Sequence, residues 1–282
     1  MKQTIFNASL EESMNLVTDK YIQTSMENVK EHGVWKKIIG IASIILIMTL
    51  FHQITKVSGF SELTFFNIPI QSISLLYLII AFILWMLFII NIFLYRHFRM
   101  FIYTIYGFFV YIETILFGLQ MFSIFVPASS EMLGVMLSFS MYCTLLLMLI
   151  IFRCNWFFNY IKDKLFNDVK RQNTLANLIY KFEIISKKYG GLLLILLLIR
   201  KWFFPSEDNN DMARFLYVSF APFLFLIGMY FCISMLAEHF QGYYLKKYSE
   251  DYRQMSGYSI EEWYGKKSKM YRDSVKQNDD LK

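Results

Sequence analysis

The apolar residues of this chain are gathered into long runs, and these runs restrict its fold more than any other feature. Hydrophobic residues make up 56% of the 282 residues and charged residues only 18%, which is respectively above and below the share in an average soluble domain. A run of about 18 or more apolar residues is what a helix needs to cross a hydrocarbon layer roughly 30 Å thick. We therefore predict an all-α fold, a polytopic transmembrane helical bundle.

The runs between charged residues predict six spans within a transmembrane domain at 38–236. They lie at about 38–57, 72–94, 101–126, 132–152, 188–205 and 213–236. The fifth is the weakest, because only the stretch from Gly190 to Ile199 is uninterrupted before Arg200 and Lys201, and that stretch is too short to cross by itself. We expect those two basic side chains to reach the outer headgroups while their stems stay in the bilayer.

The basic residues predict that both termini are cytoplasmic, because cytoplasmic loops carry an excess of Lys and Arg. With six crossings, the inside holds five Lys or Arg before the first span, two after the second, eight at 153–188 and nine after residue 236, together 24 of the 28. If 188–205 did not cross, eight or nine of these would lie outside. A composition rich in Ile, Phe, Lys and Tyr is typical of AT-rich bacterial genomes, so we expect a multi-pass protein of the bacterial plasma membrane.

The N-terminal segment 1–37 and the loop 153–189 are both long enough to fold in the cytoplasm. Residues 9–31 begin with Ser9-Leu10-Glu11-Glu12, in which Ser9 and Glu12 can satisfy each other's backbone donors as a capping box. Apolar residues follow at helical spacing, so we predict an amphipathic helix there. The 153–189 segment predicts a helical hairpin, whose halves can also be read as extensions of the fourth and fifth spans.

The C-terminal tail 237–282 interleaves tyrosines and Trp263 with nine basic residues, and Ser259 and Glu262 repeat the capping-box pattern. Aromatic and basic residues together can bind nucleic acid, but eight acidic residues in the tail weaken its attraction for phosphates, so we expect no nucleic-acid partner. The expected partners are the lipid bilayer and a membrane or cytoplasmic protein that contacts 153–189 and 237–282. The alternative is a tail that packs on the protein's own loops.

Glu113 is the ionisable residue deepest within a predicted span. A carboxylate at the centre of a lipid-facing helix costs about 2.5 to 3.5 kcal/mol, so Glu113 should face protein or water. Tyr106 and Gln120 lie seven residues to either side, and Thr114 is adjacent, which predicts an intramembrane polar site of these four residues. The site could handle protons or cations, or it could join two helices by hydrogen bonds. The joining role is favoured, since no opposite charge is expected at the same depth in another span.

The sequence contains no catalytic, cofactor-binding or metal-binding motif. Its four histidines are dispersed, and the zinc-protease, phosphate-loop, dinucleotide and nucleophile-elbow patterns are missing. We therefore predict a non-enzymatic protein that acts through protein contacts, of the accessory, assembly or toxin-immunity type. A small transporter or channel that uses Glu113 for protons or cations is the alternative.

Overall fold

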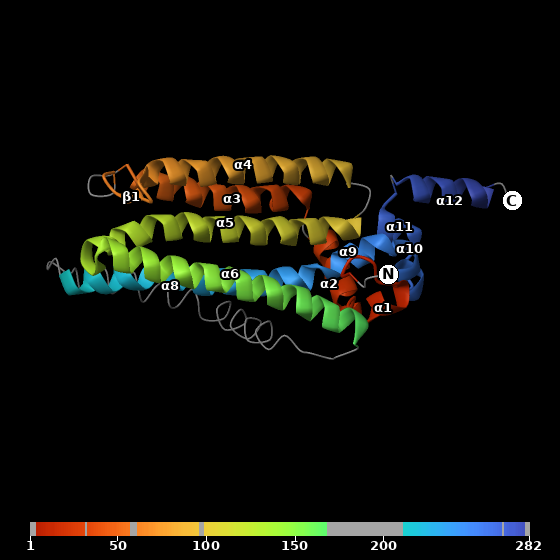
Figure 1. Cartoon of the computed structure of the whole chain (residues 1–282). Helices are drawn as coiled ribbons and strands as arrows, with labels where there is room; N and C mark the ends of the chain where they lie inside the picture. The colour runs from red at the N-terminus through yellow and green to blue at the C-terminus, as the bar shows by residue number, and fades with distance from the viewer. Residues whose placement is uncertain are drawn as a thin grey trace, which may run out of the picture.

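The computed structural model describes residues 4–31, 33–56, 61–95, 99–167, 211–266 and 268–279, and these are mostly helical (Figure 1). Five described helices are long and apolar enough to cross a membrane. They are α3 (Val34–Ile54), α4 (Ile70–Leu94), α5 (Arg99–Leu133), α6 (Val135–Phe166) and α8 (Asp211–His239). Large apolar side chains such as Leu76 and Phe82 are exposed on the outside of the bundle. That surface suits contact with lipid and would aggregate in water.

Five of the six predicted spans fall largely within these helices, and the sixth, 188–205, lies outside the described residues. Two helices are longer than predicted, since α5 ends at Leu133 and α6 at Phe166. Residues 153–166, predicted as the first half of a helical hairpin, therefore continue α6, and the second half lies outside the described residues. Nothing in the sequence before Phe166 breaks the helix, so the apolar stripe after the span simply extends it.

Helix α5 lies at the centre of the bundle and contacts α3, α4, α6 and α8. It is antiparallel to α8, because Gly107 lies against His239 and Gly118 against Met229. It is also antiparallel to α6, since Ser129 donates a 3.4 Å hydrogen bond to Ser138 across the turn that joins the two helices.

Helices α6 and α8 are parallel neighbours. Three contacts in the same order along both helices show this: Tyr142 packs on Phe223, Arg153 donates a hydrogen bond to Ser234, and Tyr160 donates one to Glu238. Helix α6 ends beside the N-terminal segment, since Asn15 donates to the carbonyl of Leu165, so α8 ends at that end of the bundle too.

The two ends of the bundle differ in structure (Figure 1). At one end, which we call the distal end, β1 (Thr64–Phe65) and β2 (Ile68–Pro69) form a short antiparallel hairpin between α3 and α4. Its turn residues Phe66 and Asn67 have φ values of 50° and 63°, as a two-residue hairpin turn requires. The rings of Phe65 and Phe66 pack on Phe139 at the start of α6.

At the other end, the N-terminal and C-terminal segments fold together into a unit that we call the terminal cap, residues 4–31 and 240–266. It contains α1 (Leu10–Met14), α2 (Asp19–Glu31), α9 (Gln241–Lys247), α10 (Ser249–Met255) and α11 (Ile260–Tyr264). Helix α12 (Lys269–Asp279) extends away from it (Figure 1). The core of the cap buries Leu16 with Tyr244 and Trp263, so much of the aromatic tail packs on the protein's own N-terminal segment.

The predicted single helix at 9–31 is wrong, because the chain turns between α1 and α2. The predicted capping box does begin α1: Glu12 N–H donates to Ser9 Oγ at 3.2 Å, and Ser9 N–H donates to Glu12 Oε2 at 2.7 Å. After α1, Leu16 turns into the core, and the hydroxyl of Thr18 accepts from the N–H of Tyr21 to begin α2. The second predicted capping box, Ser259 with Glu262, begins α11.

Candidate functional sites

The predicted intramembrane site is brought together in part, along the face of α5 that contacts α3 and α4. Tyr106 lies against α3, where its hydroxyl is 2.8 Å from the position of a Cβ on Gly40. Gln120 donates from Nε2 to the carbonyl of Met48 at 3.1 Å. Glu113 shares this face, seven residues from each, which is about 10 Å along the helix axis.

Thr114 does not join this line. Its hydroxyl donates to the carbonyl of Val110, one turn earlier in α5, at 2.8 Å. A position one residue beyond Glu113 is rotated by about 100° around the helix, toward α8. The hydroxyl is therefore satisfied by its own helix, and Thr114 has no part in a site between α5 and α3.

Glu113 is fully buried, and neither carboxyl oxygen has a hydrogen-bond partner among the described residues. The contacts of Gln120 with Ser74 and of Phe109 with Phe88 put Glu113 level with about Ala81 of α4, which is also fully buried. A charged carboxylate without a partner in such apolar surroundings is very costly. The described surroundings therefore suit a neutral carboxylic acid, or a carboxylate paired with a cation that the described residues do not supply.

A polar chain reaches from the distal end to Gln120. His52 Nδ1 is 3.2 Å from Ser74 Oγ, and Gln120 Nε2 donates to the same oxygen at 2.8 Å. All three side chains are buried, and Gln120 Oε1 has no partner among the described residues. Because about 10 Å of helix separates Gln120 from Glu113, with Phe117 between them, the chain of hydrogen bonds does not extend to the carboxyl.

A buried cation does lie at the depth of Glu113, which corrects the expectation that none would. Arg153 of α6 is 6% exposed, and its guanidinium lies 3.8 Å from the ring of Trp156 and 4.0 Å from that of Tyr230. It hydrogen-bonds Ser234 of α8, and the Gly107 and Gly118 contacts place Ser234 level with Glu113. From the sequence, Arg153 is predicted to be the first cytoplasmic residue after the fourth span, because an apolar run ends there. The aromatic Trp156 and Phe157 beyond it were the signal that the buried stripe continues.

Arg153 and Glu113 nevertheless lie on opposite sides of α5. Glu113 faces α3 and α4, whereas Arg153 lies between α6 and α8, and no ion pair joins them in the described part of the chain. The guanidinium and the carboxyl can therefore influence each other only across the body of α5.

His239, at the end of α8, is surrounded by three tyrosine rings that no local sequence pattern groups together. The ring centroids of Tyr21, Tyr103 and Tyr111 lie 6.1, 5.4 and 5.3 Å from that of the imidazole. Gly107 makes this possible, because a Cβ there would be 2.3 Å from the imidazole Cε1. Within the described ranges, no three His, Cys, Asp or Glu side chains are placed to hold a metal ion.

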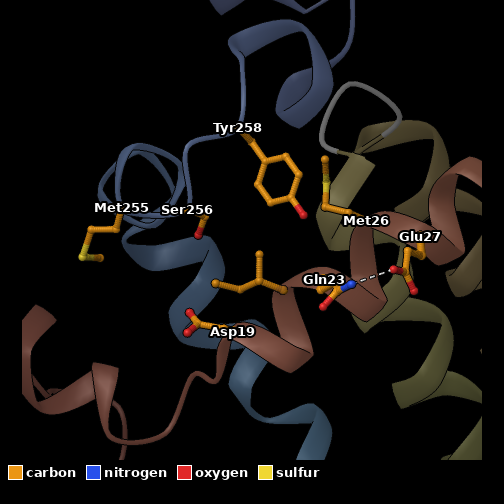
Figure 2. A pocket seen from close by; sticks show the side chains of 8 residues that line it. Asp19, Gln23, Met26, Glu27, Met255, Ser256 and Tyr258 are labelled. Atoms are coloured by element: carbon orange, nitrogen blue, oxygen red, sulfur yellow. Dashed lines mark hydrogen bonds between the residues drawn. The ribbon is translucent and has the colours of Figure 1, made fainter.

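The terminal cap contains an open groove between α2 and the end of α10 (Figure 2). Its volume is about 490 Å³, and one wall carries Asp19, Met26 and Glu27 of α2. Met255 and Tyr258 come from the opposite wall, and Tyr258 points toward Met26 in Figure 2. Sequence reasoning could not find this groove, because its walls lie more than two hundred residues apart in the chain.

No protein-family model, curated protein or solved structure matches this chain.

Proposed function

We propose that this protein is a six-span plasma-membrane protein, of bacterial origin, that acts without catalysis by binding a partner protein at its cytoplasmic terminal cap. The role is that of an accessory, assembly or toxin-immunity factor. The terminal cap and its groove support this proposal, and the distribution of basic residues supports the cytoplasmic side.

The sixth crossing is supported by the parallel arrangement of α6 and α8. Helix α6 ends beside the terminal cap, since Asn15 of the cap donates to the carbonyl of Leu165. Helix α8 ends beside the same cap, yet its Phe225 stacks on Phe125 in the distal part of α5. Helix α6 therefore ends at the cap end of the bundle and α8 begins at the distal end, so the chain has to pass from one end to the other between them. We propose that 188–205, the apolar segment in this stretch, makes that crossing.

The cytoplasmic side is supported by charge. Of the 28 Lys and Arg residues, 24 fall before the first span, between the second and third, at 153–188 or after residue 236. In the proposed topology, all of these segments lie on the side of the terminal cap. The positive-inside rule then orients the cap toward the cytoplasm.

The groove of the terminal cap is suited to one kind of partner, a basic amphipathic helix. Asp19 and Glu27 give the α2 wall two carboxylates, which attract Lys or Arg on the partner. Met255, which is half exposed, gives the wall opposite α2 a flexible apolar side chain of the type that grooves use to hold the apolar face of a helix, whereas Met26 lines the α2 wall but is almost fully buried. The hydrogen bond between Ser13 of α1 and Tyr252 of α10, at 2.7 Å, ties the segment before α2 to the helix that ends at the opposite wall.

The test is photo-crosslinking in cells, with a photoreactive amino acid in place of Met255 or, as the control, Met14. Both methionines lie in the terminal cap and are about half exposed, 50% and 48%, but only Met255 lines the groove. We expect one discrete adduct from position 255, lost when Asp19 and Glu27 are changed to Lys, and none from position 14. Equal labelling from both positions, or an adduct indifferent to the charge reversal, would refute groove binding.

The alternative function, proton or cation handling by Glu113, keeps one specific observation in its favour: the carboxyl is fully buried with both oxygens lacking partners in the described structure. Its test is flux through purified protein in liposomes, compared with Glu113→Gln. A specific proton or cation current that disappears in Glu113→Gln would establish transport and overturn the contact-only proposal. A protein that carries no current, or a current indifferent to this change, removes Glu113 from the functional account.

A further inference from the structure

A second cavity, of about 440 Å³, lies between α4, α5, α8 and α9 beside the terminal cap; His239 lines it, and neither Glu113 nor the groove does. It opens where the spans end, and Phe108 on its flank is 45% exposed. Its volume is within the range of small-molecule binding sites, about 300 to 1,000 Å³. In the proposed topology this is the level of the inner-leaflet headgroups.

The cavity is polar at its cap end and apolar deeper in the bundle. Lys246 and Tyr95 lie at the cap end, where the ends of α9 and α4 meet. Phe108 of α5 and Leu236 of α8 line it about two to three turns farther into the membrane. A phospholipid has the same gradient, with a charged headgroup at the interface and acyl chains below it.

The polar end is arranged to bind an anion. Lys246 Nζ donates to Tyr95 Oη at 2.7 Å and lies 4.0 Å from the centroid of the same ring. Because the tyrosine oxygen accepts this bond, its own O–H remains able to donate to a further acceptor. A phosphate oxygen near both groups would receive a charge-assisted bond from Lys246 and a second bond from Tyr95.

We propose that this cavity binds an anionic glycerophospholipid of the inner leaflet, with its phosphate at Lys246 and Tyr95 and one acyl chain between Phe108 and Leu236. The inference rests on the proposed cytoplasmic placement of this end and is independent of the groove. Basic pockets between spans on the cytoplasmic side are where anionic headgroups bind. A bound lipid would tie α9 of the terminal cap to the membrane surface.

The test is native mass spectrometry of the full-length protein in detergent with added phosphatidylglycerol or phosphatidylcholine. We expect one retained phosphatidylglycerol, with phosphatidylcholine retained less. Lys246→Gln should lower the phosphatidylglycerol affinity by about fivefold, the effect of one basic residue near an anionic surface. The matched control is Lys266→Gln, an exposed lysine of the same tail outside the cavity, which should leave the affinity unchanged.

A second pair of variants separates the cavity from a merely basic surface. Leu236→Trp fills the cavity and should reduce retention, whereas Leu224→Trp, on the exposed face of the same helix, should not. Equal effects within either pair, equal retention of the two lipids, or full competition by glycerol phosphate without acyl chains would overturn the proposal. The crosslinking test at Met255 remains informative in every case, because it does not depend on the cavity.

Discussion

Replacing Tyr244 with phenylalanine should open the terminal cap while leaving the bundle intact. The Tyr244 hydroxyl accepts a 3.2 Å hydrogen bond from the N–H of Ala8 and donates to the carbonyl of Ile5, and Tyr244 and Ala8 are fully buried. Removing the hydroxyl leaves a buried N–H and a buried carbonyl without a partner among the described residues. An unsatisfied buried group costs about 1 to 3 kcal/mol, so we expect a loss of about 2 kcal/mol in the free energy that holds the cap closed.

Hydrogen exchange measured by mass spectrometry reads this free energy directly, since local opening controls exchange of buried amides. A loss of about 2 kcal/mol corresponds to roughly 30-fold faster exchange, which should appear at the N-terminal segment and α1 but not in α5. Tyr243→Phe is the matched control, because its more exposed hydroxyl donates only one 3.3 Å bond, to the carbonyl of Phe6. Equal acceleration in the two variants, or none in Tyr244→Phe, would refute the reasoning.

Two further predictions concern the cap and the packing of α5. Arg253 donates a 2.6 Å hydrogen bond to Glu250 and holds the pKa of the Glu250 carboxyl below its ordinary value of 4.5. The stabilisation from this contact is therefore fully present above pH 4.5 and is lost as the pH falls through the lowered pKa. The fluorine NMR shift of buried Trp263 in fluorotryptophan-labelled protein should change as the pH falls below 4.5, and Glu250→Gln should abolish this change. The same change in the Glu250→Gln variant would exclude Glu250 as its cause. Gly107→Ala should destabilise the protein in detergent by about 1 to 3 kcal/mol, because the new methyl group would lie 2.3 Å from an imidazole carbon. Gly228→Ala, where no atom of the described residues lies within 4 Å of the new methyl, should be neutral or stabilising. The opposite order of the two variants in unfolding measurements would contradict the described packing of α5 on α8.

The features that could be predicted from the sequence are those that a short stretch of chain determines by itself. Apolar length determines whether a helix can span a bilayer, and five predicted spans correspond to helices. The capping boxes at Ser9 and Ser259 are equally local, because each needs only a hydroxyl and a carboxylate three residues apart, and both are present.

The rest depends on contacts between distant segments. The turn between α1 and α2 exists because Leu16 is drawn into a core that includes Trp263, and helical periodicity at 9–31 contains no information about that partner. Arg153 is buried because Trp156 and Tyr230 cover its guanidinium, and Tyr230 belongs to another helix. In the predicted polar site, Tyr106, Glu113 and Gln120 lie on one face of α5. Residues spaced by seven share a face of any helix, whatever the rest of the fold, so this part could be predicted.

The side of the membrane on which the terminal cap lies is the claim on which the proposed function depends, and cysteine labelling tests it most directly. In protein from which Cys143, Cys154 and Cys232 have been removed, Asp208→Cys and Met255→Cys are treated with a membrane-impermeant maleimide in intact cells. The six-span account predicts that position 208 reacts in intact cells and that position 255 reacts only after the membrane is permeabilised. Labelling of position 255 in intact cells, or protection of position 208 until permeabilisation, would contradict it.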